Sequence, residues 1–205
     1  MARETSTNDV FINCPFDAQY SKIFDALIFA IFASGFRPRS AREIDDNGEV
    51  RIEKLYRLIS QCRYGIHDIC RTQLDRENNL PRFNMPLELG IFLGAKRFGD
   101  KVQKQKCLLI FDKDKFRYQK FISDLAGMDI HSHSQQPLRV ISETRNWLAN
   151  MSEREVPGDK RILKAYKKFS DQLPTLKKKV GLPKKVQYVD YERLVVGFLS
   201  PEKKS

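Results

Sequence analysis

One carboxylate stands in an otherwise apolar helical segment. The stretch Arg82–Ala95 reads as the end of a loop followed by a buried helix, with Asn84 as a helix cap and Pro86 in the first turn. Apolar residues recur there at four-residue spacing, at Leu87, Ile91 and Ala95. Glu88 falls in the first turn, where the helix dipole favours its charged form. It either complements the helix N-terminus or serves a ligand.

Polar and aromatic residues follow the first predicted strand. Asn13 and Asp17 can bind hydroxyl groups, and Phe16 can stack on a base or a nicotinamide ring. Alternatively, Asp17 caps the next helix and Phe16 packs against it. No GxxxxGK[ST] or GxGxxG pattern follows this strand, which argues against ordinary nucleoside-triphosphate or Rossmann dinucleotide binding.

A second group of candidates closes the third predicted strand. Asp68 can orient a loop or bind a ribose, and His67 beside it points to the opposite face of the strand. Cys70 has no evident base, so we interpret it as a small buried hydrophobe. His131 and His133 share strand spacing without a nearby acidic or cysteine partner, so we expect no metal.

Arginines in the predicted loops could clamp a diphosphate. Arg39 is the candidate that we select among them. The other arginines in or near these loops are Arg42, Arg51, Arg71 and Arg82. Several loop arginines are also expected by chance in a protein this basic.

Strands and helices alternate five times along the chain, which predicts an α/β, flavodoxin-like, doubly wound and mainly parallel five-stranded sheet. The predicted strands are Val10–Cys14, Phe36–Ala41, Tyr64–Ile69, Lys106–Phe111 and Met128–His131. The predicted helices are Ala18–Ser34, Val50–Cys62, the segment after Asn84, Phe116–Leu125 and Pro137–Asn150. Ligands bind beyond the carboxyl ends of such strands, so the candidate residues should gather along one edge.

The alternation stops near residue 150. We therefore predict an α/β domain over residues 1–150 and a basic, mainly helical extension over residues 151–205. Asp159–Leu173 is predicted to be an amphipathic helix that Pro174 ends, and Val186–Tyr191 a strand or a docked tail. Residues 153–205 carry 14 Lys/Arg against 7 Asp/Glu, so a large part of the net charge of +11 lies here. Such a region attracts nucleic acid or is simply solvated.

Composition limits the remaining classes. An apolar share of 41% over 205 residues supports a real core. No secretory leader or membrane span is expected from the polar N-terminus and the short apolar runs. The four cysteines have no CxxC spacing, which makes a disulfide framework or zinc site improbable. We expect a cytoplasmic protein without a membrane partner.

Three sequence motifs in this order resemble a known superfamily. They are Phe-Ile-Asn-Cys-Pro-Phe-Asp, then Gly-Ile-His-Asp-Ile, then Asn-Met-Pro-Leu-Glu-Leu-Gly. Together they resemble the superfamily of Toll/interleukin-1-receptor (TIR) domains and nucleoside 2-deoxyribosyltransferase-like proteins, over about residues 9–150. The chain departs from the TIR pattern in two places: Asn13-Cys14 replaces a serine-rich run, and Cys70 stands where a serine is usual.

The resemblance implies that Glu88 is the catalytic residue of N-glycosidic bond cleavage, with NAD or a related nucleotide as substrate and no cofactor. A positioned carboxylate stabilises an oxocarbenium-like ribose or attacks it. The candidate substrate-binding residues are Asn13, Phe16, Asp17, Arg39, Asp68 and Asn84. By resemblance we also expect self-association or a regulatory partner, and a regulated role in bacterial anti-phage defence.

Three alternatives stay open from the sequence. One is a non-catalytic module that senses a nucleotide or recruits a protein through the same cleft. Another is deoxyribosyl transfer rather than hydrolysis. The third is an effector associated with nucleic acid through the basic C-terminal region.

Overall fold

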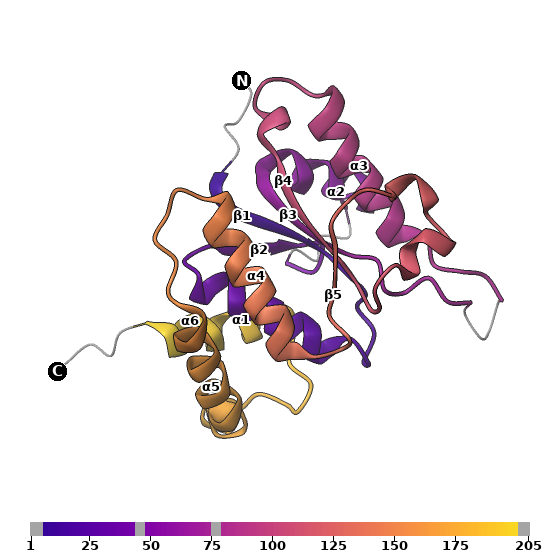
Figure 1. Ribbon diagram of the computed structural model, residues 1–205. Helices are drawn as coiled ribbons and strands as arrows, with labels where there is room; N and C mark the ends of the chain where they lie inside the picture. Colours follow the sequence, from indigo (N-terminus) through magenta and orange to yellow (C-terminus); the bar gives the residue numbers. More distant parts are fainter. Residues whose placement is uncertain (1–5, 44–47, 75–78, 201–205) are drawn as a thin grey trace. The chain divides into compact units, whose positions relative to one another are not determined.

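Five parallel strands form a single sheet (Figure 1). The computed structural model describes residues 6–43, 48–74 and 79–200. The strand order is β2-β1-β3-β4-β5, with every pair parallel. The strands are β1 (Ser6–Asn13), β2 (Arg37–Ser40), β3 (Cys62–Asp68), β4 (Cys107–Asp112) and β5 (Ile130–Ser132). This order is that of flavodoxin-like folds, and it confirms the predicted fold class.

The central strands are apolar on both faces, as strands of a covered parallel sheet must be. Their register brings polar residues to one edge of the sheet. Asn13 of β1 lies opposite His67 of β3, and Asp112 of β4 lies opposite Ser132 of β5. The carboxyl ends of four strands therefore present polar side chains close together.

Two helices cover one face of the sheet. They are α2 (Arg51–Gln61) and α3 (Asn84–Phe98). Leu58 and Ile59 of α2 and Phe92 of α3 are almost fully buried and pack with Phe11 of β1 in one apolar cluster. Gly65 of β3 lets α3 approach, since a Cβ there would lie 2.6 Å from the Phe92 ring.

The chain divides into two compact units, Met1–Ser21 with Arg37–Gln136, and Lys22–Phe36 with Pro137–Ser205. We call them the sheet unit and the helical unit. The helical unit contains nearly all of α1 (Ser21–Ala33), together with α4 (Pro137–Met151), α5 (Asp159–Lys179) and α6 (Tyr188–Leu199). It differs from the predicted extension over residues 151–205 because α1 and α4 belong to it.

An aromatic cluster forms the interior of the helical unit. The Phe169 ring of α5 lies 5.3 Å from Phe29 of α1, 5.2 Å from Phe198 of α6 and 5.8 Å from Tyr191. Phe29 and Phe169 are fully buried. Aromatic burial of this size contributes strongly to packing, so α5 and α6 are held against α1.

Three sequence predictions about secondary structure are wrong. Helix α5 runs through Pro174 to Lys179, although proline removes one backbone hydrogen bond there. Residues from Tyr188 onward form helix α6 rather than a strand. Between Phe116 and Leu125 the chain makes two short 3₁₀ turns, Arg117–Lys120 and Ser123–Leu125, in place of one helix. In the described part of the chain, no helix has the length and apolarity needed to cross a membrane.

Candidate functional site

The first turn of α3 is fixed by an asparagine from β1. The Asn13 amide nitrogen lies 2.8 Å from the Met85 carbonyl oxygen and 3.1 Å from His67 Nδ1. Because an amide nitrogen donates, His67 Nδ1 accepts, and the neutral ring carries its proton on Nε2. Burial, together with the positive charge of Lys106, lowers the pKa of His67 to about 3. Asn13 and a neutral His67 thus attach α3 to the ends of β1 and β3.

Glu88 occupies a core position of α3, beyond the first turn in which the sequence pattern placed it. The buried residues of this helix are Met85, Glu88, Leu89 and Phe92, spaced as one helical face. Leu87, which the sequence pattern placed inside, is 56% exposed, whereas Glu88 is 7% exposed. The apolar spacing in the sequence therefore predicted Leu87 as a buried residue of α3, one position before the residue that is buried, Glu88.

The Glu88 carboxyl has no hydrogen-bond or ion-pair partner among the described residues. Burial raises its pKa to about 7, and the attraction of Arg51 opposes this only in part. An acid in this state exchanges its proton near neutral pH. Buried, unpaired carboxyls with strongly raised pKa values concentrate at functional sites.

The Cys14 thiol is affected by the charges of both Asp68 and Glu88. Burial raises the pKa of the Cys14 thiol well above its usual value, and the charges of Asp68 and Glu88 raise it further. Cys14 directly follows β1, so it lies where Asn13 meets the first turn of α3. The positive charge of Arg42 opposes this rise, and the Cys14 thiol stays protonated.

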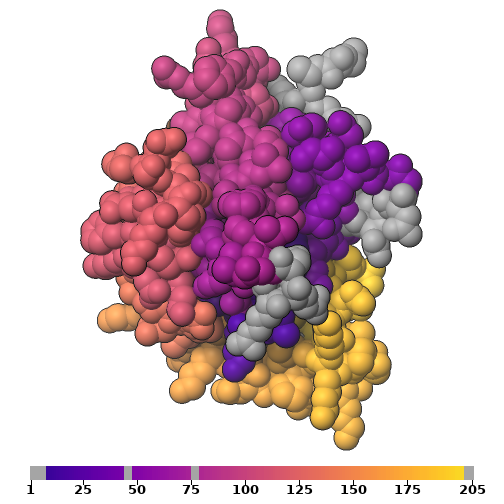
Figure 2. Space-filling model, turned by 90° about the vertical axis from the view of Figure 1, so that its right-hand side faces the viewer, coloured from indigo at the N-terminus to yellow at the C-terminus, as the bar shows by residue number. Residues whose placement is uncertain are grey.

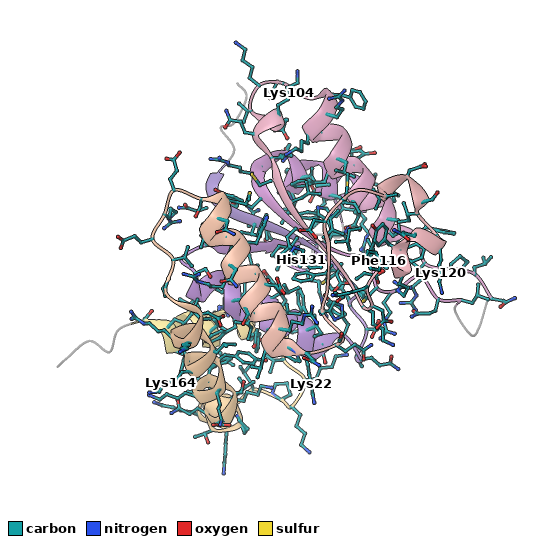
Figure 3. All side chains as sticks on the ribbon, viewed as in Figure 1. Lys22, Lys104, Phe116, Lys120, His131 and Lys164 are labelled. Carbon is teal, nitrogen blue, oxygen red and sulfur yellow. The ribbon has the colours of Figure 1, made fainter. Side chains whose placement is uncertain are left out.

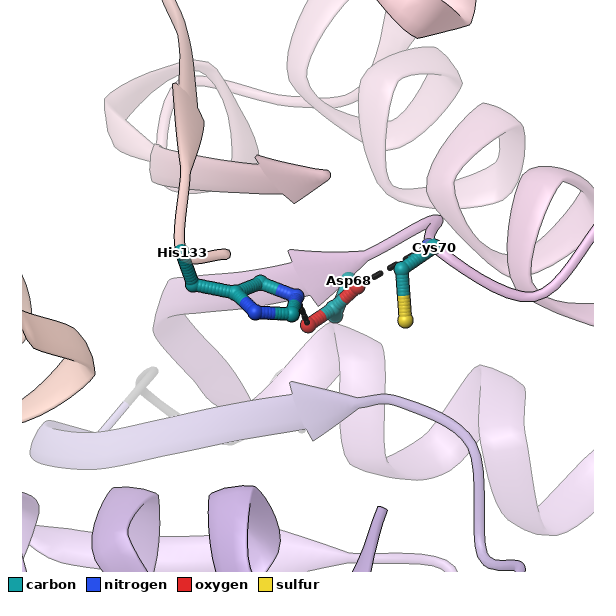
Figure 4. A group of neighbouring side chains, drawn as sticks. All are labelled: Asp68, Cys70 and His133. Carbon is teal, nitrogen blue, oxygen red and sulfur yellow. Dashed lines mark hydrogen bonds and ion pairs between the residues drawn. The ribbon is translucent and has the colours of Figure 1, made fainter. Parts of the chain in front are cut away.

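Both carboxylate oxygens of Asp68 accept hydrogen bonds from the protein itself. Its Oδ2 accepts a hydrogen bond from the Tyr20 hydroxyl at 2.6 Å, and its Oδ1 accepts one from the backbone N–H of Cys70 at 2.9 Å. His133 Nε2 lies 3.0 Å from the same Oδ2 (Figure 4). Asp68 and His133 are fully buried. Asp68 therefore ties the loop before α1, the end of β3 and the end of β5 together.

Asp68, Cys70 and His133 also have the residue types of a metal site, with ligand atoms within 4.8 Å of one another. The position of the proton on the His133 ring argues against a metal at this cluster. The Gln135 backbone N–H donates to His133 Nδ1 at 2.8 Å, so the neutral ring carries its proton on Nε2, facing Asp68. A metal on Nε2 would force that proton onto Nδ1, against the Gln135 N–H. Asp68 is held instead by the hydrogen bonds from Tyr20 and Cys70, while His133 Nε2 lies close to it without the geometry of a hydrogen bond.

Asp17 and Phe16, two of the predicted substrate-binding residues, contact other residues of the protein. Asp17 Oδ1 accepts hydrogen bonds from the backbone N–H groups of Gln19 and Tyr20 and pairs with Arg71 at 3.0 Å. It therefore caps the turn before α1, which was the alternative interpretation. The Arg42 guanidinium lies over the half-buried ring of Phe16, 5.3 Å from its centroid.

Arg39 is paired with two acidic residues, whereas Asn84 is exposed. The Arg39 guanidinium binds Glu43 through two nitrogens and Asp9 at 2.7 Å, and these bonds raise its pKa. Its role as a phosphate clamp stays a prediction that would require breaking these pairs. Asn84 is exposed as the first residue of α3. The expected Asn84 cap is wrong, since Phe83 holds the N-cap position and no side chain there bonds the helix.

Sequence reasoning missed a second buried acid at the same edge. Asp112 ends β4 and is fully buried, where it accepts hydrogen bonds from Arg117 Nε at 2.8 Å and from Nη2 at 2.6 Å. Burial raises the pKa of Asp112, and Arg117 opposes the rise. Arg117 also donates to the Ile69 carbonyl and the Thr72 hydroxyl. The end position on the clearest predicted strand was the available signal for Asp112.

A mostly apolar pocket of ≈ 480 Å³ lies along another face of α3. The surface view shows α3 bordering the segment that follows β4 (Figure 2). The lining residues include Pro86, Leu89, Gly90 and Leu93 of α3, together with Phe121, Ile122 and Leu125. Glu88 is not among them, because it points about 150° away around the helix from the centre of this face. The pocket can hold an apolar group next to α3 without touching the carboxyl.

Comparisons with protein families, characterised proteins and solved structures found no match to the chain. The TIR and deoxyribosyltransferase-like resemblance therefore stays a prediction from the three motifs, while the fold class stands on the sheet itself.

Proposed function

We propose that the chain cleaves the N-glycosidic bond of NAD or a related nucleotide, with Glu88 as the catalytic carboxylate. The observation that carries the proposal is the buried Glu88 carboxyl, which has no partner among the described residues and whose pKa is raised to about 7. It lies on α3 at the junction of β1 and β3, where the strand order reverses. Open α/β sheets bind ligands at that point.

The chemistry uses the uncompensated charge of this carboxyl. When the bond from ribose C1′ to the nicotinamide nitrogen breaks, the electron pair leaves with the nitrogen and the ring becomes neutral. The ribose develops positive charge, which an adjacent carboxylate stabilises or traps covalently. Water then adds to C1′ and releases a proton. A ligand with a cationic ring also lowers the pKa of Glu88, so binding favours the reactive, ionised form.

The supporting residues have distinct roles in this proposal. Asn13 is a positioning residue, since its amide holds the Met85 carbonyl one turn before Glu88. Phe16 is half-buried and is the aromatic candidate for stacking on the leaving ring. Asp68 has no open oxygen at the surface, so we assign it to shaping the edge rather than to ribose binding.

The test is product analysis by mass spectrometry after incubation with NAD, nucleosides and deoxynucleosides. Glu88→Gln should lower kcat by at least about a hundredfold, the usual cost of losing one transition-state contact. Glu53→Gln removes an exposed first-turn carboxylate of α2 and serves as the matched control. Full activity of Glu88→Gln would exclude Glu88 as the catalytic group.

One observation favours a non-catalytic, nucleotide-sensing alternative. The described pocket on α3 does not include Glu88 among its lining residues. Saturable binding of NAD by calorimetry, with no product formed and with the same affinity in Glu88→Gln, would support this alternative and contradict the hydrolase.

A further inference from the structure

Helix α5 has two faces of opposite character. Ile162 and Phe169 are buried on one face, and Phe169 contacts rings of α1 and α6. Tyr166 on the same side lies 5.2 Å from Phe29. These contacts fix the rotation of the helix about its own axis. The opposite face is thereby held outward.

The outward face is a row of cations. Its basic residues are Lys160, Arg161, Lys164, Lys167, Lys168, Lys178 and Lys179, and all are exposed. Lys164 is labelled in Figure 3. In the described ranges none of these side chains has an ion-pair partner. The one acid on this face is Asp171. At 1.5 Å per residue the row extends over about 29 Å.

We infer that this row, the α5 basic face, binds the phosphate backbone of double-stranded nucleic acid. Five of the seven cations lie within residues 160–168, and Lys178 and Lys179 follow at the far end of the helix. A duplex carries one negative charge per about 1.7 Å of axis, so a row of this length spans several phosphates. No aromatic side chain lies on the face to stack on a base, so the contact is with phosphates and independent of sequence. The inference does not depend on the proposed function.

An anionic membrane is the competing partner, and the packing of α5 disfavours it. Helices that bind membranes bury an apolar face among the lipids. In α5 that face is already occupied, since Phe169 is fully buried against Phe29. Only the charge remains available, and a rigid row of point charges suits a regular polyanion.

The salt dependence of binding gives the quantitative test. If five of the cations contact phosphates, the slope of log K against log salt is about −4.5, and affinity falls about 500-fold between 50 and 200 mM salt. The assay is fluorescence anisotropy of the full chain with a labelled 24-base-pair DNA duplex of arbitrary sequence. Vesicles containing phosphatidylserine are titrated in parallel.

Reversing charges on α5 is a more specific test than deleting the helix, because deletion would expose the aromatic cluster around Phe29. The variant is Lys164→Glu/Lys167→Glu/Lys168→Glu. The matched control reverses three scattered exposed lysines, Lys22, Lys104 and Lys120, and changes the net charge equally (Figure 3). Circular dichroism confirms that both variants keep the helical content of the parent.

The α5 variant should lose at least about thirtyfold in affinity at 100 mM salt and reduce the slope by about 2.7, whereas the control should change affinity less than about threefold. Equal losses in both variants would overturn the inference, since net charge alone would then explain them. Binding of vesicles without binding of the duplex would overturn it too. Glu88→Gln should bind the duplex like the parent, which separates this result from the outcome of the NAD assay.

Discussion

Replacing Glu88 by glutamine should stabilise the sheet unit above neutral pH. The folded protein must hold an ionised carboxylate in a buried position without a partner, which costs free energy that glutamine does not incur. The raised pKa, from 4.5 to about 7, measures this cost. At 1.36 kcal/mol per pKa unit, the upper limit is about 3 kcal/mol.

The sign follows from proton binding. Between pH 4.5 and 7 the folded protein binds more protons at Glu88 than the unfolded chain does, so the parent loses stability as pH rises through this window. Below pH 4.5 the carboxyl is neutral in both states, and above pH 7 the loss is complete. The difference in free energy of unfolding between Glu88→Gln and the parent should therefore be larger at pH 8 than at pH 4.5, by up to about 3 kcal/mol.

The assay is urea unfolding followed by pulsed thiol labelling with a dipyridyl disulfide, a class of reagent that still reacts with thiols in acid, and by mass spectrometry. Cys14, Cys62 and Cys70 are buried in the sheet unit, so their labelling reports on the unfolding of this unit. Glu53→Gln is the control, because the side chain is exposed on α2 and its replacement should leave the pH dependence unchanged. A stability difference for Glu88→Gln that is constant between pH 4.5 and 8, or that shrinks toward pH 8, would refute the reasoning.

Three further predictions concern the sheet unit. If the ionised carboxyl is the reactive form, kcat/KM for NAD should rise about tenfold per pH unit below pH 7 and level off above it, and a flat pH profile would contradict that role. Gly65→Ala places a Cβ 2.6 Å from the Phe92 ring and should cost roughly 1–3 kcal/mol of unfolding free energy in urea denaturation. Gly94→Ala, where a Cβ meets nothing within 4 Å, should not destabilise the protein. Tyr20→Phe removes the 2.6 Å hydrogen bond to Asp68 and should cost roughly 1–3 kcal/mol in the same measurement, so an unchanged midpoint would show that Asp68 does not need this donor.

The sequence predicted the sheet well because the signals for it are local. Short apolar runs ended by polar residues marked β1, β3 and β4, and alternation with amphipathic helices implied that the strands are parallel. The polar strand β2 was predicted from its place in this alternation. The errors fall where tertiary packing overrides local preference. Pro174 did not end α5, since the half-buried Leu173 and Leu176 flank it on the packed side of the helix. Residues 188–191 formed a helix whose Tyr191 packs on Phe169.

The sequence predicted which residues lie at the candidate site better than it predicted what those residues bind. The strand-end rule brought Asn13 and Glu88 to the same edge without any structure. It could not assign the hydrogen bonds, because the partners are distant in sequence. Asp68 meets Tyr20 across 48 positions, and Arg39 meets Asp9 across 30. Such pairings decide which polar groups remain available to a ligand, and no local pattern encodes them.

These pairings also bear on why Glu88 differs from the other acids at this edge. Asp68 has donors for both carboxylate oxygens, and Asp112 has Arg117. Each of these side chains lies on a strand end, where neighbouring loops supply N–H groups. Glu88 lies on the inner face of a helix beside Met85, Leu89 and Phe92, and no described residue supplies it with a hydrogen-bond partner. Among these acids Glu88 alone has neither a hydrogen bond nor an ion pair in the described ranges, although Asp112 Oδ2 is also without a hydrogen-bond partner. The function proposed above would explain why a residue that destabilises the fold is retained.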